Sequence, residues 1–310
     1  MRKGGIILLD KKQDITSMAS DNYIKKLMGT KKVGHSGTLD PFATGLLPVF
    51  VDDALKVMRY TDGYDKGYSC VVKFGERTDT QDLQGQVIGG RMPSDDEIKA
   101  MEANDFQEIR AAFEQIKAMK EQVPPMYSAK KINGVKAYDL ARKGIEVELK
   151  AAPITIYNLD VDYIRVEEGA IYAKFDVECS KGTYIRKICD DLGEITGFGA
   201  HAISLRRTKC GPFRVEDAHT EEELKSMSEG GTNFLVDPVL ALSHMPRLEV
   251  NAKTFAAIKL GKKTPAPDGV EYDVKYAAFY GDQLAAVLYK SDEEDGKTVM
   301  RIERMLASDV

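Results

Sequence analysis

Residues 171–179 alternate apolar and polar side chains with a period of two. This pattern predicts a strand with one face buried and one face in water, as in an antiparallel sheet. Apolar runs predict further strands at residues 5–9, 47–51, 68–74 and 201–208. Helices are predicted at residues 17–29, 94–118 and 183–195. Because strands and helices do not alternate in a regular βαβ order, we predict an α+β fold with a mixed, largely antiparallel sheet flanked by helices.

The length of 310 residues predicts more than one domain. Pro238 and Pro246 follow an acidic stretch and indicate a boundary near residue 246. The remaining residues contain several short strand-like runs and a helical segment at residues 252–260. We therefore expect a large domain over residues 1–245 and a small β-rich domain over residues 246–310.

A protruding arm is predicted at residues 123–150. The segment begins with Pro124 and Pro125, and the later Asn133-Gly134 pair is typical of a two-residue hairpin turn. Five basic side chains cluster around this turn: Lys130, Lys131, Lys136, Arg142 and Lys143. The arm is therefore a candidate for contact with an acidic partner.

Composition limits the classes of function. No stretch approaches the roughly 18 consecutive apolar residues that a membrane-spanning helix needs, and the start of the chain lacks the apolar core of a signal peptide. We expect a cytoplasmic monomer without membrane contact. The four cysteines form no CxxC pair, and the four histidines are scattered. We therefore expect no metal and no cofactor.

The charges are segregated along the chain. Residues 1–75 carry 12 Lys and Arg against 8 Asp and Glu, and residues 128–143 and 179–214 carry the same excess of positive charge. Residues 76–116 and 216–229 are acidic, which gives a net charge of −5. Because the field that attracts a ligand is local, a protein that folds its basic segments onto one face can bind a polyanion despite an acidic total.

The densest motif lies at residues 34–48, where Gly34, Gly37, Gly45 and Pro41 interrupt any regular period. The segment lacks the ending of a P-loop and the spacing GxGxxG, so it does not predict nucleotide binding. Its distinctive group is one carboxylate, Asp40, directly before the proline. From the residues alone, Asp40 is either a functional carboxylate or a side chain that caps a turn.

This segment resembles the signature of the TruB-type tRNA pseudouridine synthases, which act at position 55 in the T loop of tRNA. The resemblance covers residues 4–215. The matching segments, in the order of the family, are residues 66–68, 75–80 with Asp82 and Gly85, 123–130, 144–147, 179–186, 190–193 and 205–207. Residues 247–310 are similar in composition to the small PUA-like RNA-binding tail of the family. The resemblance thus implies a pseudouridine synthase domain followed by a tail that assists RNA binding.

The resemblance implies an isomerase that detaches a uracil from its ribose, turns it and rejoins it through carbon. A carboxylate suits this task because it is ionised at neutral pH, can attack and can leave again. By resemblance this catalytic group is Asp40, and Arg186 pairs with it and keeps it charged. The sequence leaves three routes open: attack on the ribose, attack on the base, and a glycal.

The family also implies how the base reaches the carboxylate, since a base inside the folded T loop must be flipped out of its stack. Tyr68 matches the tyrosine that stacks on the flipped base, and its hydroxyl is a candidate for removal of the C5 proton. Tyr184 lies near the catalytic pair in the family, and Leu205 lines the apolar side of the pocket. His35 occupies the space that the flipped nucleotide leaves.

The predicted arm resembles the RNA-clamping insertion of the family. Lys130 and Lys131 are therefore expected to contact phosphates of the tRNA T arm. Such contacts position RNA without reading its sequence, so specificity is expected to come from the shape of the T loop and from the flipped base.

The sequence departs from the family at two places and leaves two other classes of function open. Asp52 and Asp53 stand where the family has a glycine-containing turn, and Leu83 replaces a commonly polar residue. One alternative is an RNA chaperone that grips tRNA without catalysis. The other is a glycoside or nucleoside hydrolase with paired carboxylates, which would release free sugar or uracil.

Overall fold

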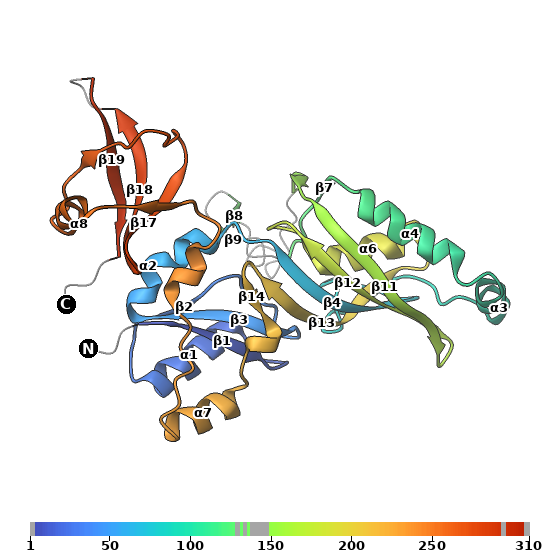
Figure 1. Cartoon of the computed structure of the whole chain (residues 1–310). Helices are drawn as coiled ribbons and strands as arrows, with labels where there is room; N and C mark the ends of the chain where they lie inside the picture. The colour runs from blue at the N-terminus through green and yellow to red at the C-terminus, as the bar shows by residue number, and fades with distance from the viewer. Residues whose placement is uncertain (1–3, 128–130, 133–134, 137–148, 293–295, 307–310) are drawn as a thin grey trace.

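A central sheet organises the larger part of the chain (Figure 1). The structure is a computed structural model that describes residues 4–127, 131–132, 135–136, 149–292 and 296–306. The strands follow the order β1-β3-β13-β4-β12-β11, with β2 beside β3 and β14 beside β13. Their bounds are β1 Ile6–Lys11, β2 Val33–His35, β3 Thr44–Val51, β4 Lys66–Phe74, β11 Ile156–Glu167, β12 Ala170–Cys179, β13 Ala200–Cys210 and β14 Phe213–Arg214.

Within this sheet β13 and β3 run parallel, and the other pairs are antiparallel. The predicted α+β class with a mixed, largely antiparallel sheet is confirmed. The longer helices are α1 Ser17–Met28, α3 Asp95–Ala103, α4 Gln107–Ala118, α6 Ile185–Thr196, α7 Glu221–Glu229 and α8 Ala252–Lys259, and a short α2 spans Leu55–Met58. Single turns of 3-10 helix lie at Asp52–Ala54, Arg59–Thr61, Val215–Asp217 and Pro238–Leu242.

Strand β12 has the alternation that the sequence predicted. Ile171, Ala173, Phe175 and Val177 are buried, and the residues between them are more exposed. Helices α4 and α6 cover the buried face, where the ring of Phe113 lies 5.3 Å from that of Phe175. Removal of these side chains from water is the main force that holds the helices on the sheet.

The single helix predicted over residues 94–118 is two helices. Asp105 and Phe106 have φ angles of +54° and +55°, which end α3 and turn the chain before α4 begins. Phe106 is buried in the turn, so packing of the ring stabilises a backbone conformation that side chains of its size rarely adopt. Ile109, Phe113 and Ile116 of α4 lie in the core, so this helix is held by one buried face.

Small strands attach the remaining segments. β5 Arg77–Thr78 pairs with β6 Val87–Gly89, and β7 Glu121–Gln122 pairs with β10 Ala152–Pro153. In the predicted arm, β8 Lys131–Ile132 pairs antiparallel with β9 Val135–Lys136, which agrees with the hairpin expected there. Residues 133–134 and 137–148 lie outside the described part of the chain.

Asp52 explains how the chain accommodates its departure from the family. Its φ of +52° lies in the left-handed region, where a glycine is the usual residue and aspartate is among the better substitutes. The Thr30 hydroxyl donates a hydrogen bond of 2.6 Å to the Asp52 carboxylate. In the turn after β3, this side-chain hydrogen bond therefore stabilises a backbone conformation that a glycine would adopt without strain.

The last 60 or so residues form a five-stranded sheet in the order β15-β17-β18-β19-β16. The strands are β15 Arg247–Glu249, β16 Thr264–Pro265, β17 Lys275–Tyr280, β18 Gln283–Asp292 and β19 Thr298–Met305. This sheet packs on the β1–β3 end of the molecule through one shared apolar cluster, which includes Ile6, Phe50, Ala277, Phe279 and Val287. The tail sheet is therefore attached by a buried apolar contact as well as by the chain.

All four cysteines are buried free thiols. Within the described residues, no helix is long and apolar enough to cross a membrane.

Candidate active site

Asp40 lies in the loop between β2 and β3, and side chains from the first strand and helix fix that loop. Ser17 of α1 makes two contacts with Leu39: the Leu39 N–H donates to the Ser17 hydroxyl (2.9 Å), and the hydroxyl donates to the Leu39 carbonyl (3.1 Å). The Asp14 N–H donates to the Pro41 carbonyl at 2.8 Å. The residues on both sides of Asp40 are therefore anchored to the segment that joins β1 to the start of α1.

Lys11 places a cation beneath this loop. Its Nζ donates to the carbonyls of Lys12, Ile15 and Pro41 at 2.9, 2.8 and 3.1 Å, and the residue is fully buried. Burial lowers the pKa of Lys11 to about 8, against the opposing attraction of Asp40 and Asp14. The three hydrogen bonds satisfy the ammonium group and tie β1 to the loop that carries Asp40.

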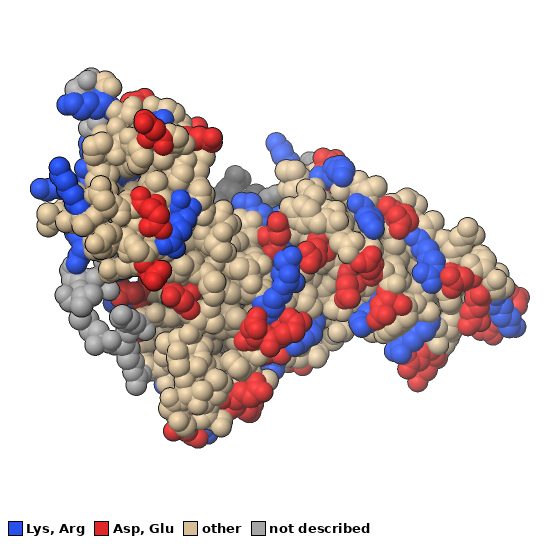
Figure 2. Space-filling view, in the orientation of Figure 1, with Lys and Arg blue, Asp and Glu red and all other residues tan. Residues whose placement is uncertain are grey.

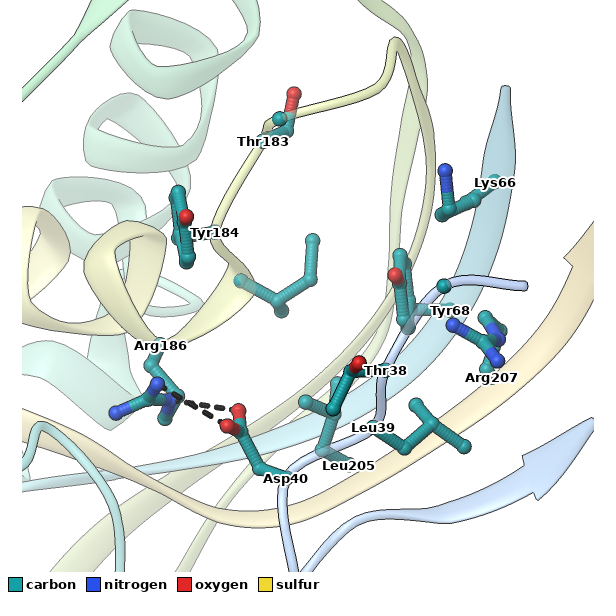
Figure 3. Close-up of a pocket in the computed structure, with 13 residues that line it drawn as sticks. Thr38, Leu39, Asp40, Lys66, Tyr68, Thr183, Tyr184, Arg186, Leu205 and Arg207 are labelled. Atoms are coloured by element: carbon teal, nitrogen blue, oxygen red, sulfur yellow. Dashed lines mark hydrogen bonds and ion pairs between the residues drawn. The ribbon is translucent and has the colours of Figure 1, made fainter. Parts of the chain in front are cut away.

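Arg186 holds Asp40 through both carboxylate oxygens (Figure 3). It extends from the first turn of α6, and its Nε and Nη2 donate to Asp40 at 2.9 and 3.3 Å. Nη1 donates to the Thr80 carbonyl (2.6 Å) and Nη2 to the Tyr127 carbonyl (2.9 Å). The buried carboxylate of Asp82 lies 3.5 Å from Nη1. The guanidinium is only 4% exposed, so these partners fix its position and direction.

The carboxyl group of Asp40 faces a pocket. Its side chain remains 39% exposed, whereas that of Arg186 is buried. The surrounding protein raises the pKa of Asp40 above its ordinary value, because removal from water disfavours the charged form more than Arg186 favours it. A carboxylate with this environment is less well solvated than one on the surface, which makes it more reactive toward a bound group.

The pocket has a volume of about 280 Å³ and brings together most of the predicted site. Tyr68 of β4, Tyr184 before α6 and Leu205 of β13 line it together with Asp40 and Arg186, as Figure 3 shows. The backbone of Tyr184 is fixed by Gln122, which accepts from its N–H at 2.8 Å and donates to its carbonyl at 3.2 Å. Burial raises the pKa of Tyr68 to about 12, so its phenol is neutral at neutral pH.

Three predicted residues are not part of this pocket. His35 lies next to the loop, with Nδ1 2.9 Å from the Asp21 carboxylate and Nε2 3.2 Å from the Thr38 hydroxyl. Lys130 and the side chain of Lys131 lie outside the described residues. Their roles remain predictions.

The sequence analysis assigned no role to two cations of the pocket, Lys66 and Arg207. The sequence could have placed both on the pocket face, because side chains two residues apart on a strand point to the same side of the sheet. Lys66 is two residues from Tyr68 on β4, and Arg207 is two residues from Leu205 on β13. Gly45 allows the Asp40 loop to approach β13 here, since a Cβ at its φ of +96° would lie 2.4 Å from the Arg207 carbonyl. A larger residue would separate the loop from the strand.

A cluster of three carboxylates on α6 is paired with two cations, Arg77 and Lys187. Asp190, Asp191 and Glu194 of α6 have oxygens within 4.8 Å of one another. Asp190 accepts from Arg77 at 2.7 Å and from Lys187 at 3.0 Å. These ion pairs attach the segment after β4 to α6.

The fold resembles that of two solved structures. A chain of "Crystal Structure of a Cbf5-Nop10-Gar1 Complex" matches with a TM-score of 0.70 and 23% identity over 98% of this chain and 85% of that chain. A chain of "Structure of H/ACA RNP bound to a substrate RNA containing 2'-deoxyuridine" matches with a TM-score of 0.69 and 22% identity over the same shares. These likenesses establish a shared fold.

Family models and sequence relatives define the class. The model described as "TruB family pseudouridylate synthase (N terminal domain)" matches residues 25–185, and "tRNA pseudouridylate synthase B C-terminal domain" matches residues 186–240. The chain is thus a pseudouridylate synthase.

Two curated relatives, from Bacillus pumilus (strain SAFR-032) and Aromatoleum aromaticum (strain DSM 19018 / LMG 30748 / EbN1), carry the name "tRNA pseudouridine synthase B". The first is 37% identical over 93% of this chain and 90% of the relative, and the second is 40% identical over 86% and 82%. More narrowly, the chain belongs to the TruB family.

Proposed function

We propose that this protein converts a uridine in the T loop of tRNA, at position 55, to pseudouridine with Asp40 as the catalytic carboxylate. The observation that carries the proposal is the contact between Asp40 and Arg186, which leaves the carboxyl group directed into a pocket of about 280 Å³. The names of the curated relatives support tRNA as the substrate.

The reaction is an isomerisation, so its atoms balance within the RNA. The bond from C1′ of the ribose to N1 of uracil breaks, a bond from C1′ to C5 forms, the C5 proton leaves and N1 gains a proton. No oxidant or reductant is consumed. Asp40 attacks the ribose or the base, or removes a ribose proton to give a glycal, and each route needs an ionised carboxylate held close to the reacting atom of the sugar or the base.

The other pocket residues are proposed to hold the flipped nucleotide. Tyr68 stacks on the uracil, Leu205 supplies an apolar contact beneath it, and Tyr184 packs beside the catalytic pair. His35, which lies outside the pocket, is proposed to take the place of the flipped base in the T loop. Three cations line the pocket with one carboxylate, which favours the approach of an anionic strand.

We propose that residues 1–245 form the catalytic domain and residues 246–310 a PUA-like domain that assists RNA binding. The arm, with Lys130 and Lys131, is proposed to contact the T arm. Figure 2 shows positive and negative side chains interspersed over the visible face of the larger domain, so a second contact in the tail would add useful affinity. A monomer is proposed to act in the cytoplasm, where its tRNA substrate is found.

Release of tritium from tRNA labelled at C5 of uridine tests the function against both alternatives. The synthase releases one tritium for each uridine converted, because the C5 proton must leave. An RNA chaperone would bind the tRNA and release none. A hydrolase would produce labelled free uracil, which chromatography separates from tritiated water.

Truncation after residue 246 should weaken binding without abolishing the chemistry, because Asp40, Tyr68 and Arg186 all precede it. The truncation also exposes Ile6 and Phe50 of the shared apolar cluster, so we expect a lower melting temperature. Single-turnover conversion should remain measurable at saturating enzyme and at a temperature below the new transition. Complete loss of conversion in a soluble, folded truncation would contradict the proposal that the tail assists binding without supplying chemistry.

The affinity for tRNA should fall steeply with salt, since lysines that contact phosphates release counterions. Reversal of Lys130 and Lys131 to Glu should make the slope of log affinity against log salt shallower by about 2. Lys225→Glu, at an exposed lysine on the acidic helix α7, is the matched control and should leave the slope unchanged. An unaltered slope in the double variant would place the RNA away from the arm.

A further inference from the structure

Arg207 is a buried cation without an acidic partner among the residues that the structure describes. The residue is 0% exposed, and its Nε donates to the Leu46 carbonyl at 2.7 Å. Within the described residues, its Nη2 has no hydrogen-bond partner and no carboxylate lies within ion-pair distance. Arg186 in the same pocket has two carboxylates within 3.5 Å. Burial of an unpaired guanidinium is strongly unfavourable, so its retention calls for a compensating interaction.

The group that Arg207 contacts is Tyr68. The two residues are direct neighbours across the β13–β4 pair, which places both side chains on the same face of the sheet. Both side chains line the same pocket, and the positive charge of the Arg207 guanidinium favours the ionised form of the Tyr68 phenol. Figure 3 shows the two side chains together at the edge of the pocket, with Lys66 above them.

Chemistry fixes how these two neighbours can pair. A guanidinium carries only donors, so toward Arg207 the phenol oxygen of Tyr68 can act only as an acceptor. The phenol proton is therefore free to donate to a third group, and the adjacent positive charge makes that proton a stronger donor. Tyr68 lines the pocket opposite Asp40, so a ligand in the pocket is the acceptor within its reach.

Uracil develops a negative charge in the reaction proposed above. If the C1′–N1 bond breaks, its electron pair stays with the base and spreads over N1 and the carbonyl oxygens. If Asp40 attacks the base instead, the charge collects on a carbonyl oxygen. In both cases a donor held in place before the reaction stabilises the charge as it forms.

We propose that Arg207 is a positioning residue that holds the Tyr68 hydroxyl as a polarised hydrogen-bond donor to the anionic uracil. Tyr68 keeps its proton throughout, and the C5 proton leaves to another acceptor. This inference rests on the proposed function and assigns Tyr68 a role opposite to that of a proton-abstracting base. A purely structural Arg207 would only brace β13 against β3 through the Leu46 carbonyl.

Two substitutions of Tyr68 measure the stacking and the donor separately. Tyr68→Phe keeps the stacking face, so tRNA affinity should stay within about threefold while the single-turnover rate falls about 100-fold, the effect of losing one such donor. Tyr68→Ala should damage both. Equal rates for the wild type and Tyr68→Phe would restrict Tyr68 to stacking and overturn the proposal.

The decisive experiment places 3-fluorotyrosine at position 68 by codon suppression and follows its ionisation by fluorine NMR. Arg207→Gln should raise the pKa of the fluorophenol and lower the single-turnover rate about 100-fold, whereas Arg207→Lys keeps the charge and should lose about tenfold. Arg206→Gln is the matched control: it removes the neighbouring arginine, which pairs with Asp10, and should leave this pKa unchanged.

The rates then separate a donor from a base. Fluorotyrosine is a stronger acid than tyrosine and therefore a stronger donor. With Arg207 present, the protein with fluorotyrosine at position 68 should convert tRNA at least as fast as the protein with tyrosine. In Arg207→Gln, fluorotyrosine should restore part of the lost single-turnover rate. Slower reaction with fluorotyrosine in both backgrounds would make Tyr68 a base and overturn the proposal, as would an unchanged pKa in Arg207→Gln. If Arg207→Gln does not fold, two measurements still test the proposal. These are the rate of Arg207→Lys and the comparison of tyrosine with fluorotyrosine in the protein that keeps Arg207. Absence of pseudouridine in the wild type would reject the proposed function, while the NMR titration still tests the contact.

Discussion

Replacement of Arg186 by Gln should lower the single-turnover rate at least 1,000-fold, the upper range for loss of one preorganised charged group. The substitution removes the cation that both oxygens of Asp40 accept from, and it leaves the buried Asp82 without the guanidinium 3.5 Å away. Unpaired buried carboxylates are destabilising, so we expect a loss of about 3–5 kcal/mol in the free energy of unfolding.

The pH dependence of Arg186→Gln has a definite sign. Burial already raises the pKa of Asp40, and Arg186 opposes that rise. Without Arg186 the pKa should rise further, so the remaining activity should be lost at a higher pH as the solution is acidified. Arg186→Lys keeps the charge but cannot span both carboxylate oxygens, and its rate should lie between those of Gln and the wild type.

Arg91→Gln is the matched control for Arg186. Arg91 also donates to both oxygens of a carboxylate, that of Glu97, but its side chain is 54% exposed. An exposed pair of this kind is worth less than about 1 kcal/mol, so neither stability nor rate should change appreciably. A rate for Arg186→Gln within tenfold of the wild type across the pH range would contradict the role of the pair.

Asp40→Asn should abolish the chemistry while it preserves binding. The amide keeps the shape of the side chain but lacks its charge and nucleophilicity, so the pocket should still admit a flipped uridine. We expect tRNA affinity within about tenfold of the wild type, or ~1.4 kcal/mol. No pseudouridine should form, even in a single turnover with enzyme in excess.

The controls for Asp40→Asn address purity, charge and metal. Mass spectrometry must exclude deamidation of Asn back to Asp. Asp53→Asn removes a carboxylate that is 62% exposed and paired with Lys56, and it should keep the full rate. Wild-type activity should also persist with a chelator and no added metal. Substantial conversion by pure Asp40→Asn would falsify the assignment and direct attention to Asp82, the other carboxylate beside Arg186.

The pattern of apolar and polar residues predicted the helices and strands better than the places where they break. Period two located β12 because burial of one face imposes that alternation. The break between α3 and α4 was missed because Phe106 takes an unfavourable backbone angle that only its packing in the core stabilises. A pattern along the chain does not contain that tertiary contact.

In the site, too, contacts between distant parts of the chain could not be predicted from local pattern. Asp40 and Arg186 are separated by 146 residues, and no periodicity relates them, so the pairing could be expected only from the family resemblance. The alternation of side chains along β13 could have placed Arg207 on the pocket face, but its lack of an acidic partner among the described residues depends on everything that packs around it. The Lys130 and Lys131 contacts stay a prediction, since their side chains lie outside the described residues.

The most direct test of the central claim is nucleoside analysis of unmodified tRNA after incubation with the wild-type protein, with the site mapped by chemical labelling of pseudouridine. We expect close to one pseudouridine per tRNA, at position 55 in the T loop, no change in RNA mass, no free uracil, and no product with Asp40→Asn. Release of uracil, product at other positions only, or intact uridine after incubation with a protein that binds the tRNA would contradict the central claim.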